Sequence, residues 1–298
     1  MLFWSSYVHR NSSINNYDAN SWTVLTDIER RIKEKIEKVG TPLKDWEIQI
    51  NYGIKTGFND AFIIDGSKRK ELIEKHPKSE EIIRPILRGR DIKKFGNDFS
   101  DTFLICTFPS LRIEINNYPA IKEHFLSFGF ERLKQTGEKG ARKKTNNKWY
   151  EIQDSINYYE ELDKPKIIYP EITKFLNFYL DDKQFTVNNK CFILTGKHIA
   201  FLTAFCNSSL FKFCFIDNFP ELLGGSRELR KIFFEKIPII KVNNETNETF
   251  NNLLLKIQSL KIMGVDTKEY EIKIDDMIFD LYELIEEEKK IIGFIEII

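Results

Sequence analysis

Several features that mark membrane, secreted or metal-binding proteins are missing from this 298-residue sequence. Its longest apolar runs, such as Phe213-Cys214-Phe215-Ile216, fall far short of the roughly 20 residues that span a bilayer. The N-terminus has no basic leader followed by a long apolar stretch, so it does not indicate a secretion signal. The four cysteines form no Cys-x-x-Cys pair and have no histidine at zinc-finger spacing. We therefore predict reduced, mostly buried thiols in a cytoplasmic protein.

Clustered catalytic histidines and an excess of charge of one sign are also absent. The four histidines are scattered and lack serine or cysteine partners at a recognisable spacing, and the formal net charge is zero. A zero net charge argues against an evenly basic binder of nucleic acid. The charge is unevenly distributed, however. Residues 68–94 hold ten Lys and Arg against five acids, residues 134–148 hold six against one, and residues 269–298 hold ten acids against three lysines. The two basic segments suit phosphate, whereas the acidic end suits water or protein.

The composition is that of a folded chain with a sizeable core. It is 42% hydrophobic and contains 25 Phe and 11 Tyr, which favours a packed interior built partly on sheets. Apolar spacing predicts an amphipathic helix over 27–39 that ends at Gly40-Thr41-Pro42. We predict an α+β (mixed) fold with short strands over 46–65 and strands at 103–108, 167–169 and 191–194. Helices are expected at 68–75, 118–133, 250–263 and 274–292, and also within 197–215, where Asn207-Ser208-Ser209 interrupts the helix. A mobile polar loop is expected at 135–147 and a polar linker at 243–252.

The most informative stretch of the sequence is residues 53–64, where two glycine turns lie beside short apolar strands. Gly53 and Gly57 permit backbone angles closed to other residues, so the chain can turn sharply and a ligand can approach the main chain. Lys55, Thr56 and Asn59 then lie on the turn and can read base edges, or simply stabilise it through side-chain hydrogen bonds.

A second block, Ile83-Arg84-Pro85-Ile86-Leu87-Arg88-Gly89-Arg90-Asp91-Ile92, follows these turns. Pro85 and Gly89 interrupt regular structure, and three arginines lie near one another. Arginine forks suit phosphate oxygens and the guanine edge. The alternative is a surface loop whose charges face water.

The order of these two blocks resembles the start of the target-recognition domain in adenine-specific DNA methyltransferases of the TaqI and Eco57I type, including fused type IIG restriction-modification enzymes. The ordered matches run from about Trp46 to Glu288 and cover most of the chain. They continue through Trp149-Tyr150-Glu151-Ile152, Lys164-Pro165-Lys166-Ile167-Ile168-Tyr169-Pro170-Glu171-Ile172, Leu223-Gly224-Gly225-Ser226-Arg227 and Ile274-Asp275-Asp276-Met277-Ile278-Phe279-Asp280-Leu281-Tyr282-Glu283-Leu284.

The resemblance implies a domain that recognises double-stranded DNA without modifying it. We expect a connector with its helix at 1–45, a β-rich recognition domain with interspersed helices at 46–242, and a helical segment at 243–298. The methyltransferases of this family use an Asn-Pro-Pro-Tyr type motif, and this chain contains no Pro-Pro pair. We therefore assign no catalytic, cofactor-binding or metal-binding residue, and expect S-adenosylmethionine, with or without magnesium, on a separate or missing catalytic domain.

The resemblance and the charge pattern together give a set of predicted DNA contacts. Basic loops would hold phosphates while the glycine turns enter the major groove. Trp149 and Tyr150 line a groove in this interpretation, or belong to the core in the simpler one. The predicted contacts are Lys55, Thr56, Asn59, Arg88, Arg90, Lys139, Arg142, Lys143, Lys144 and Arg227.

Two other classes of function remain as alternatives. Asp163, Glu171 and Lys174 have a spacing that superficially resembles a metal-dependent nuclease. The acidic end and the connector helix would instead suit a protein-interaction module that binds no DNA. The chain is expected to be either a separate specificity polypeptide that docks on a methyltransferase or endonuclease polypeptide, or the remnant of an interrupted gene.

Overall fold

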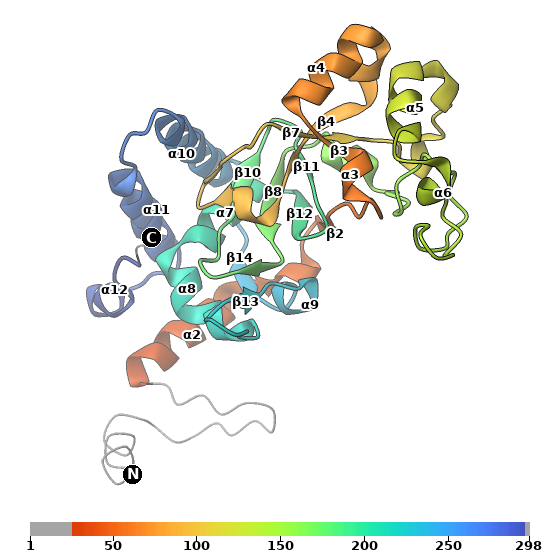
Figure 1. The fold of residues 1–298 in the computed structure, drawn as a ribbon. Helices are drawn as coiled ribbons and strands as arrows, with labels where there is room; N and C mark the ends of the chain where they lie inside the picture. The colour runs from red at the N-terminus through yellow and green to blue at the C-terminus, as the bar shows by residue number, and fades with distance from the viewer. Residues whose placement is uncertain (1–25, 296–298) are drawn as a thin grey trace. The chain divides into compact units, whose positions relative to one another are not determined.

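The structure is a computed structural model that describes residues 26–295 (Figure 1). Its contacts divide the chain into two compact units. We call Ile48–Ile199 the central unit, and Met1–Glu47 with Ala200–Ile298 the terminal unit. The three-part division predicted from the sequence, at 1–45, 46–242 and 243–298, stays a prediction.

An antiparallel four-stranded sheet forms one part of the central unit. Ile193 of its third strand pairs with Ile168 on one side and Asn51 on the other. Every residue of its second strand is buried, as expected for a strand covered on both faces. The strand order is β10 (Tyr179–Asp181), β8 (Lys166–Pro170), β12 (Cys191–Gly196) and β2 (Ile48–Tyr52). The strands predicted at 167–169 and 191–194 are confirmed.

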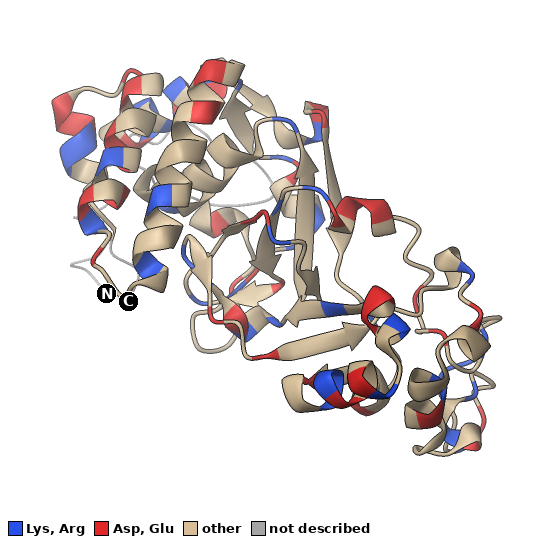
Figure 2. Ribbon diagram, turned by 90° about the horizontal axis from the view of Figure 1, so that it is seen from above, with Lys and Arg blue, Asp and Glu red and all other residues tan. Residues whose placement is uncertain are grey.

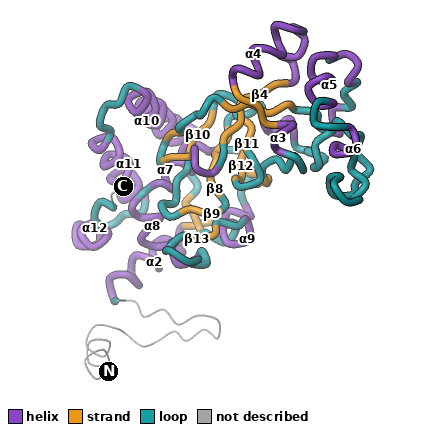
Figure 3. The backbone as a smooth tube through the Cα atoms, viewed as in Figure 1, coloured by secondary structure: helices purple, strands orange, loops and turns teal. Residues whose placement is uncertain are grey.

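A second four-stranded sheet completes the larger β structure of this unit, and the strands appear in orange in Figure 3. Its order is β11 (Thr186–Val187), β4 (Ile83–Leu87), β7 (Thr102–Ile105) and β3 (Ile63–Asp65). The first two strands run parallel and the other pairs antiparallel. The strand predicted over 103–108 is confirmed in its first half and ends before Pro109.

Short elements surround these sheets. The helix expected over 118–133 is two helices, because Gly129 takes a φ of 89° between them. A small hairpin pairs Ile92 with Asn97. The elements are α3 (Asn59–Phe62), α4 (Gly66–Lys75), β5 (Ile92–Lys93), β6 (Gly96–Asn97), α5 (Pro119–Leu126), α6 (Phe130–Leu133) and β9 (Ile172–Thr173).

The terminal unit is mainly helical. Its first helix, α2 (Asp27–Val39), has the predicted bounds and begins with a capping box between Thr26 and Glu29. Strand β1 (Gly40–Pro42) then pairs with β14 (Pro238–Ile240). The remaining elements are α7 (Ile199–Asn207), α8 (Ser209–Phe215), β13 (Arg227–Glu228), α9 (Lys231–Phe234), α10 (Asn244–Ile262), α11 (Lys268–Leu281) and α12 (Glu286–Ile292).

Two expectations for this unit are wrong. The polar segment 243–252 is helical from Asn244, because the side chain of Asn243 accepts a hydrogen bond from Thr246 N at 2.8 Å and caps α10. The single helix predicted over 274–292 is broken between α11 and α12, where Glu283 takes a φ of 50°. Figure 2 shows Lys and Arg interspersed with Asp and Glu on the helices of this unit.

Within residues 26–295, no single helix has the length and apolar character needed to cross a membrane. Segments 199–207 and 209–218 pass that test only as a pair, with a 69° bend between them. Most of their side chains are buried inside the fold.

Candidate functional site

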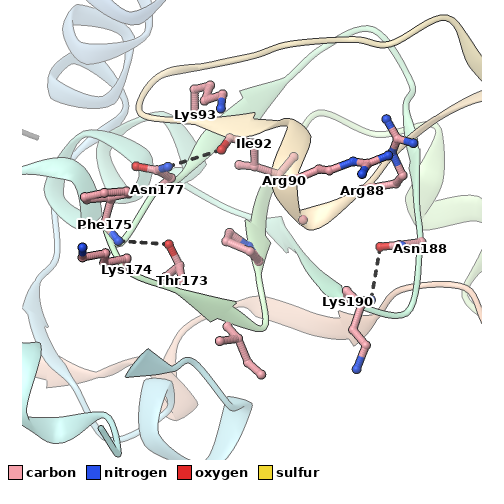
Figure 4. A pocket seen from close by; sticks show the side chains of 13 residues that line it. Arg88, Arg90, Ile92, Lys93, Thr173, Lys174, Phe175, Asn177, Asn188 and Lys190 are labelled. Carbon is pink, nitrogen blue, oxygen red and sulfur yellow. Dashed lines mark hydrogen bonds between the residues drawn. The ribbon is translucent and has the colours of Figure 1, made fainter. Parts of the chain in front are cut away.

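A hollow of about 600 Å³ opens in the central unit, and we call it the basic hollow (Figure 4). Three chain segments form it: residues 88–93, 170–177 and 188–190. Five cations line it and no Asp or Glu does; the five are Arg88, Arg90, Lys93, Lys174 and Lys190. Because the lining side chains carry charge of only one sign, the hollow attracts anions, and its concave wall concentrates the electrostatic field.

Backbone contacts hold the three segments together. Asn188 N donates to Leu87 O at 3.1 Å, and Glu171 N donates to Lys190 O at 2.8 Å. Gly89 lies against Lys190, since a Cβ built on this glycine would be 3.3 Å from the Lys190 carbonyl oxygen. The hollow is therefore framed by main chain, and its side chains extend from fixed positions.

Arg88 is tied down by its neighbour Asp91, which is buried. Asp91 Oδ2 accepts hydrogen bonds from Arg88 N at 2.8 Å and from Arg88 Nε at 3.0 Å, and Asp91 Oδ1 accepts one from Nη2 at 3.1 Å. The same Nη2 donates to Ser100 Oγ. This bidentate pair orients the guanidinium and offsets part of its charge.

Arg90 and Lys190 are the most exposed cations of the hollow for which an ion pair is seen. Their side chains are 73% and 63% exposed. Their carboxylate partners are distant, at 4.0 Å for Arg90 Nε to Asp91 Oδ1 and 3.6 Å for Lys190 Nζ to Glu171 Oε2. Pairs so exposed are weak, so both cations can turn to an external anion.

Apolar groups line the hollow together with the cations. Pro170, Ile92, Ile172 and Phe175 contribute them, and Phe175 is 40% exposed. The adjacent Leu176 is buried and takes a φ of 51°, which anchors the loop and leaves Phe175 outside. Lys174 Nζ lies 5.7 Å from the centroid of the Phe175 ring.

The glycine turns face their own chain. A Cβ on Gly53 would be 2.0 Å from the carbonyl oxygen of Asn188, and Gly53 N donates to Cys191 O at 2.8 Å. Gly53 therefore lets two strands meet, where the sequence suggested room for a ligand. Gly57 has a φ of 80°, as the predicted sharp turn requires.

The polar residues of this turn support it from within. Thr56 is buried, its Oγ1 donates to Asn59 Oδ1 at 2.7 Å, and Phe58 N donates to the same Oγ1 at 3.2 Å. This is the turn-stabilising alternative stated above. Lys55 is exposed, and its backbone N donates to Asp154 Oδ2 at 3.0 Å.

Arg142 is buried, and the prediction that it contacts phosphate is wrong for this structure. Its Nε donates to Leu133 O at 2.9 Å, and its Nη1 donates to Thr56 O at 3.1 Å and Glu151 O at 2.8 Å. Nη2 donates to Trp149 O at 2.6 Å. Burial lowers the pKa of this guanidinium to about 10, so it stays protonated at neutral pH. Arg142 joins the glycine turn to the loop that carries it.

We call residues 135–147 the basic loop. Backbone hydrogen bonds close it, from Gly137 N to Arg142 O at 2.9 Å and from Thr145 N to Gln135 O at 3.1 Å. The lysines at 139, 143 and 144 are exposed. They remain suitable for phosphate, as predicted.

The structure also places the remaining residues that the sequence analysis singled out. Arg227, in the terminal unit, is 16% exposed and pairs with Glu221 at 3.0 Å and Asp217 at 3.3 Å, which offsets its charge. Tyr150 is buried and its OH donates to Ile113 O at 2.9 Å, which agrees with the core interpretation. Trp149 is half-buried and packs on Phe130.

The carboxylates considered for a nuclease have basic partners. Asp163 pairs with Arg84, and Glu171 lies near Lys190. In the part of the chain that the structure describes, no group of three or more His, Cys, Asp or Glu is placed to hold a metal ion.

Sequence reasoning missed part of the basic hollow. Lys93, Phe175 and Lys190 carried no motif, and Lys174 was considered only for the nuclease alternative. The pairing of β11 with β4 brings residues 188–190 to 88–93, and the pairing of β12 with β8 brings them to 170–177. No local spacing signals these pairings.

Comparison with known proteins identifies the family. The pattern of the TaqI-like C-terminal specificity domain matches residues 84–239, which is more than half of the chain. The chain belongs to this family of specificity domains.

Two solved structures share its α+β fold. The type IIG restriction endonuclease BpuSI matches with a TM-score of 0.51 and 15% identity over 87% of this chain and 34% of that one. The type IIL restriction-modification enzyme MmeI, solved in complex with DNA, matches with a TM-score of 0.54 and 12% identity over 82% of this chain and 34% of that one. The chain thus spans about a third of the length of these two enzymes.

Proposed function

We propose that this chain is a DNA target-recognition part of a restriction-modification system, and that its central unit binds duplex DNA at the basic hollow. The observation that carries this proposal is the set of five cations around one concavity that no Asp or Glu lines. Membership of a family of specificity domains supports it, as does the likeness in fold to MmeI, which was solved with DNA.

In the first step of the proposed mechanism, the protein is positioned on the DNA through contacts with the phosphate backbone. Arg90 and Lys190 hold phosphates because their side chains are 73% and 63% exposed and their ion pairs are long, at 4.0 Å and 3.6 Å. Arg88, locked by Asp91, offers a fixed guanidinium edge. Lys139, Lys143 and Lys144 of the basic loop, with Lys55, add a second group of phosphate contacts.

At a finer level, we propose that the system is an adenine-specific DNA methyltransferase of the TaqI and Eco57I type or a type IIG enzyme, acting in the cytoplasm. S-adenosylmethionine, with magnesium where cleavage occurs, would bind a catalytic domain outside this chain. This chain would contribute specificity by holding the DNA in a defined register.

Salt dependence of duplex binding tests the proposal. Each phosphate contact contributes about 0.9 to the slope of log K against log salt, so the double variant Arg90→Ala, Lys190→Ala should reduce the slope by about 2. The matched control is Lys70→Ala, Lys75→Ala, which removes two cations of 78% and 52% exposure on α4 and should leave the slope unchanged. Equal slopes for the two double variants would refute the assignment to the hollow. The absence of salt-sensitive binding by the wild type would favour the protein-interaction alternative.

A further inference from the structure

We propose that the basic hollow takes one unstacked nucleotide of the bound DNA, with its base on the ring of Phe175 and its flanking phosphates on the surrounding cations. The inference rests on the proposed DNA binding and adds the chemical class of ligand that the hollow accepts.

The mixed lining of the hollow points to this class. A phosphate group alone requires cations and gains nothing from apolar surface. Here Ile92, Ile172 and Phe175 line the same hollow as Arg90, Lys174 and Lys190. A nucleotide combines a flat, largely apolar base with anionic groups on either side. A hollow of about 600 Å³ also lies within the usual range for sites that hold small ligands.

Phe175 is placed as a stacking surface. The residue is 40% exposed, although apolar side chains of this size gain most from burial. Buried Leu176 on one side, and the hydrogen bond from Phe175 N to Thr173 Oγ1 at 3.1 Å on the other, fix the backbone that presents the ring. An exposed aromatic ring in a cationic groove is the arrangement that proteins use to bind unpaired bases.

Base geometry explains why the nucleotide has to leave the duplex. In a paired and stacked duplex the flat faces of the bases are covered by their neighbours, and only their edges reach the grooves. The ring of Phe175 can therefore meet a base face only if that nucleotide is unstacked. The five cations allow two adjacent phosphates of one strand to be held while the base between them turns inward.

Three duplexes of one sequence test the inference with the full chain. The first is fully paired, the second has one unpaired nucleotide, and the third has an abasic residue at that position. The wild type should bind the second about tenfold more tightly than the third, because one base stacked on an aromatic ring is worth on the order of tenfold in affinity. Phe175→Leu should abolish this preference. Phe175→Tyr, which keeps the ring, should retain the preference.

The outcomes separate this inference from the proposed function. If the paired duplex binds with the salt dependence assigned to Arg90 and Lys190 but the wild type shows no preference for the unpaired nucleotide, the nucleotide site is refuted and DNA binding stands. Retention of the preference in Phe175→Leu would refute it as well. If a free deoxyadenosine monophosphate competes as well as the second duplex, the ligand is a free nucleotide and the inference fails. If no duplex binds at all, the proposed function itself fails.

Discussion

The basic hollow draws three of its five cations from one positive segment of the sequence, the basic loop lies in another, and the fold uses the two segments differently. In each, one arginine is held internally: Arg88 by the carboxylate of Asp91, and Arg142 by four backbone carbonyls. The neighbouring cations point to solvent. A run of Lys and Arg therefore contains both structural and surface charges, and only the three-dimensional contacts separate them.

The two regions also differ in how many segments form them. The loop draws its lysines from one stretch of chain, whereas the hollow combines three stretches and places apolar groups among its cations. The loop is thus suited to phosphate contact alone. The hollow is suited to a ligand that carries both charge and an apolar face.

The largest expected effect concerns the buried arginine. Arg142→Ala leaves the carbonyls of Leu133, Thr56, Glu151 and Trp149 without this donor, and should lower the free energy of unfolding by about 3 kcal/mol. Urea denaturation of the full chain measures this change. The adjacent exposed Lys143→Ala is the control and should change the same quantity by less than about 0.5 kcal/mol. Similar losses in both variants would show that the internal and surface roles are not divided as described.

A smaller effect is expected from the surface lysines of the loop. The triple variant Lys139→Ala, Lys143→Ala, Lys144→Ala should keep its stability and bind duplex about tenfold more weakly at low salt, because phosphate contacts are lost without loss of packing. It should keep the preference for an unpaired nucleotide, since that preference belongs to the hollow. Fluorescence anisotropy on the same duplexes measures both quantities. If the triple variant lost the preference together with the affinity, the two regions would act as one site.

Much of the fold follows from local sequence signals. Apolar spacing predicts α2 with its observed bounds, and short β-branched runs predict β8 and β12. The start of α10 was missed because polar residues on an exposed helix face resemble a linker, and the cap at Asn243 was the only signal. The break after α11 has no glycine or proline to announce it.

The candidate site is only partly readable from the sequence. Arg88 and Arg90 were identified because they share a short motif, but Lys190 and Phe175 join them through strand pairing. Arg142 could not be distinguished from Lys143 and Lys144 in sequence, because its internal hydrogen bonds include one to the carbonyl of Thr56, which is far away along the chain. Charge patterns locate basic segments, and long-range contacts decide which charges meet a ligand.

Differential acetylation of lysines, with and without saturating duplex DNA at low salt, tests the central claim most directly. Mass spectrometry then gives the reactivity of each lysine in the full chain. The account predicts that Lys93, Lys174 and Lys190 of the basic hollow lose reactivity when DNA is bound, while Lys70 and Lys75 of α4 keep theirs. Unchanged reactivity at Lys174 and Lys190 in the presence of bound DNA would contradict it.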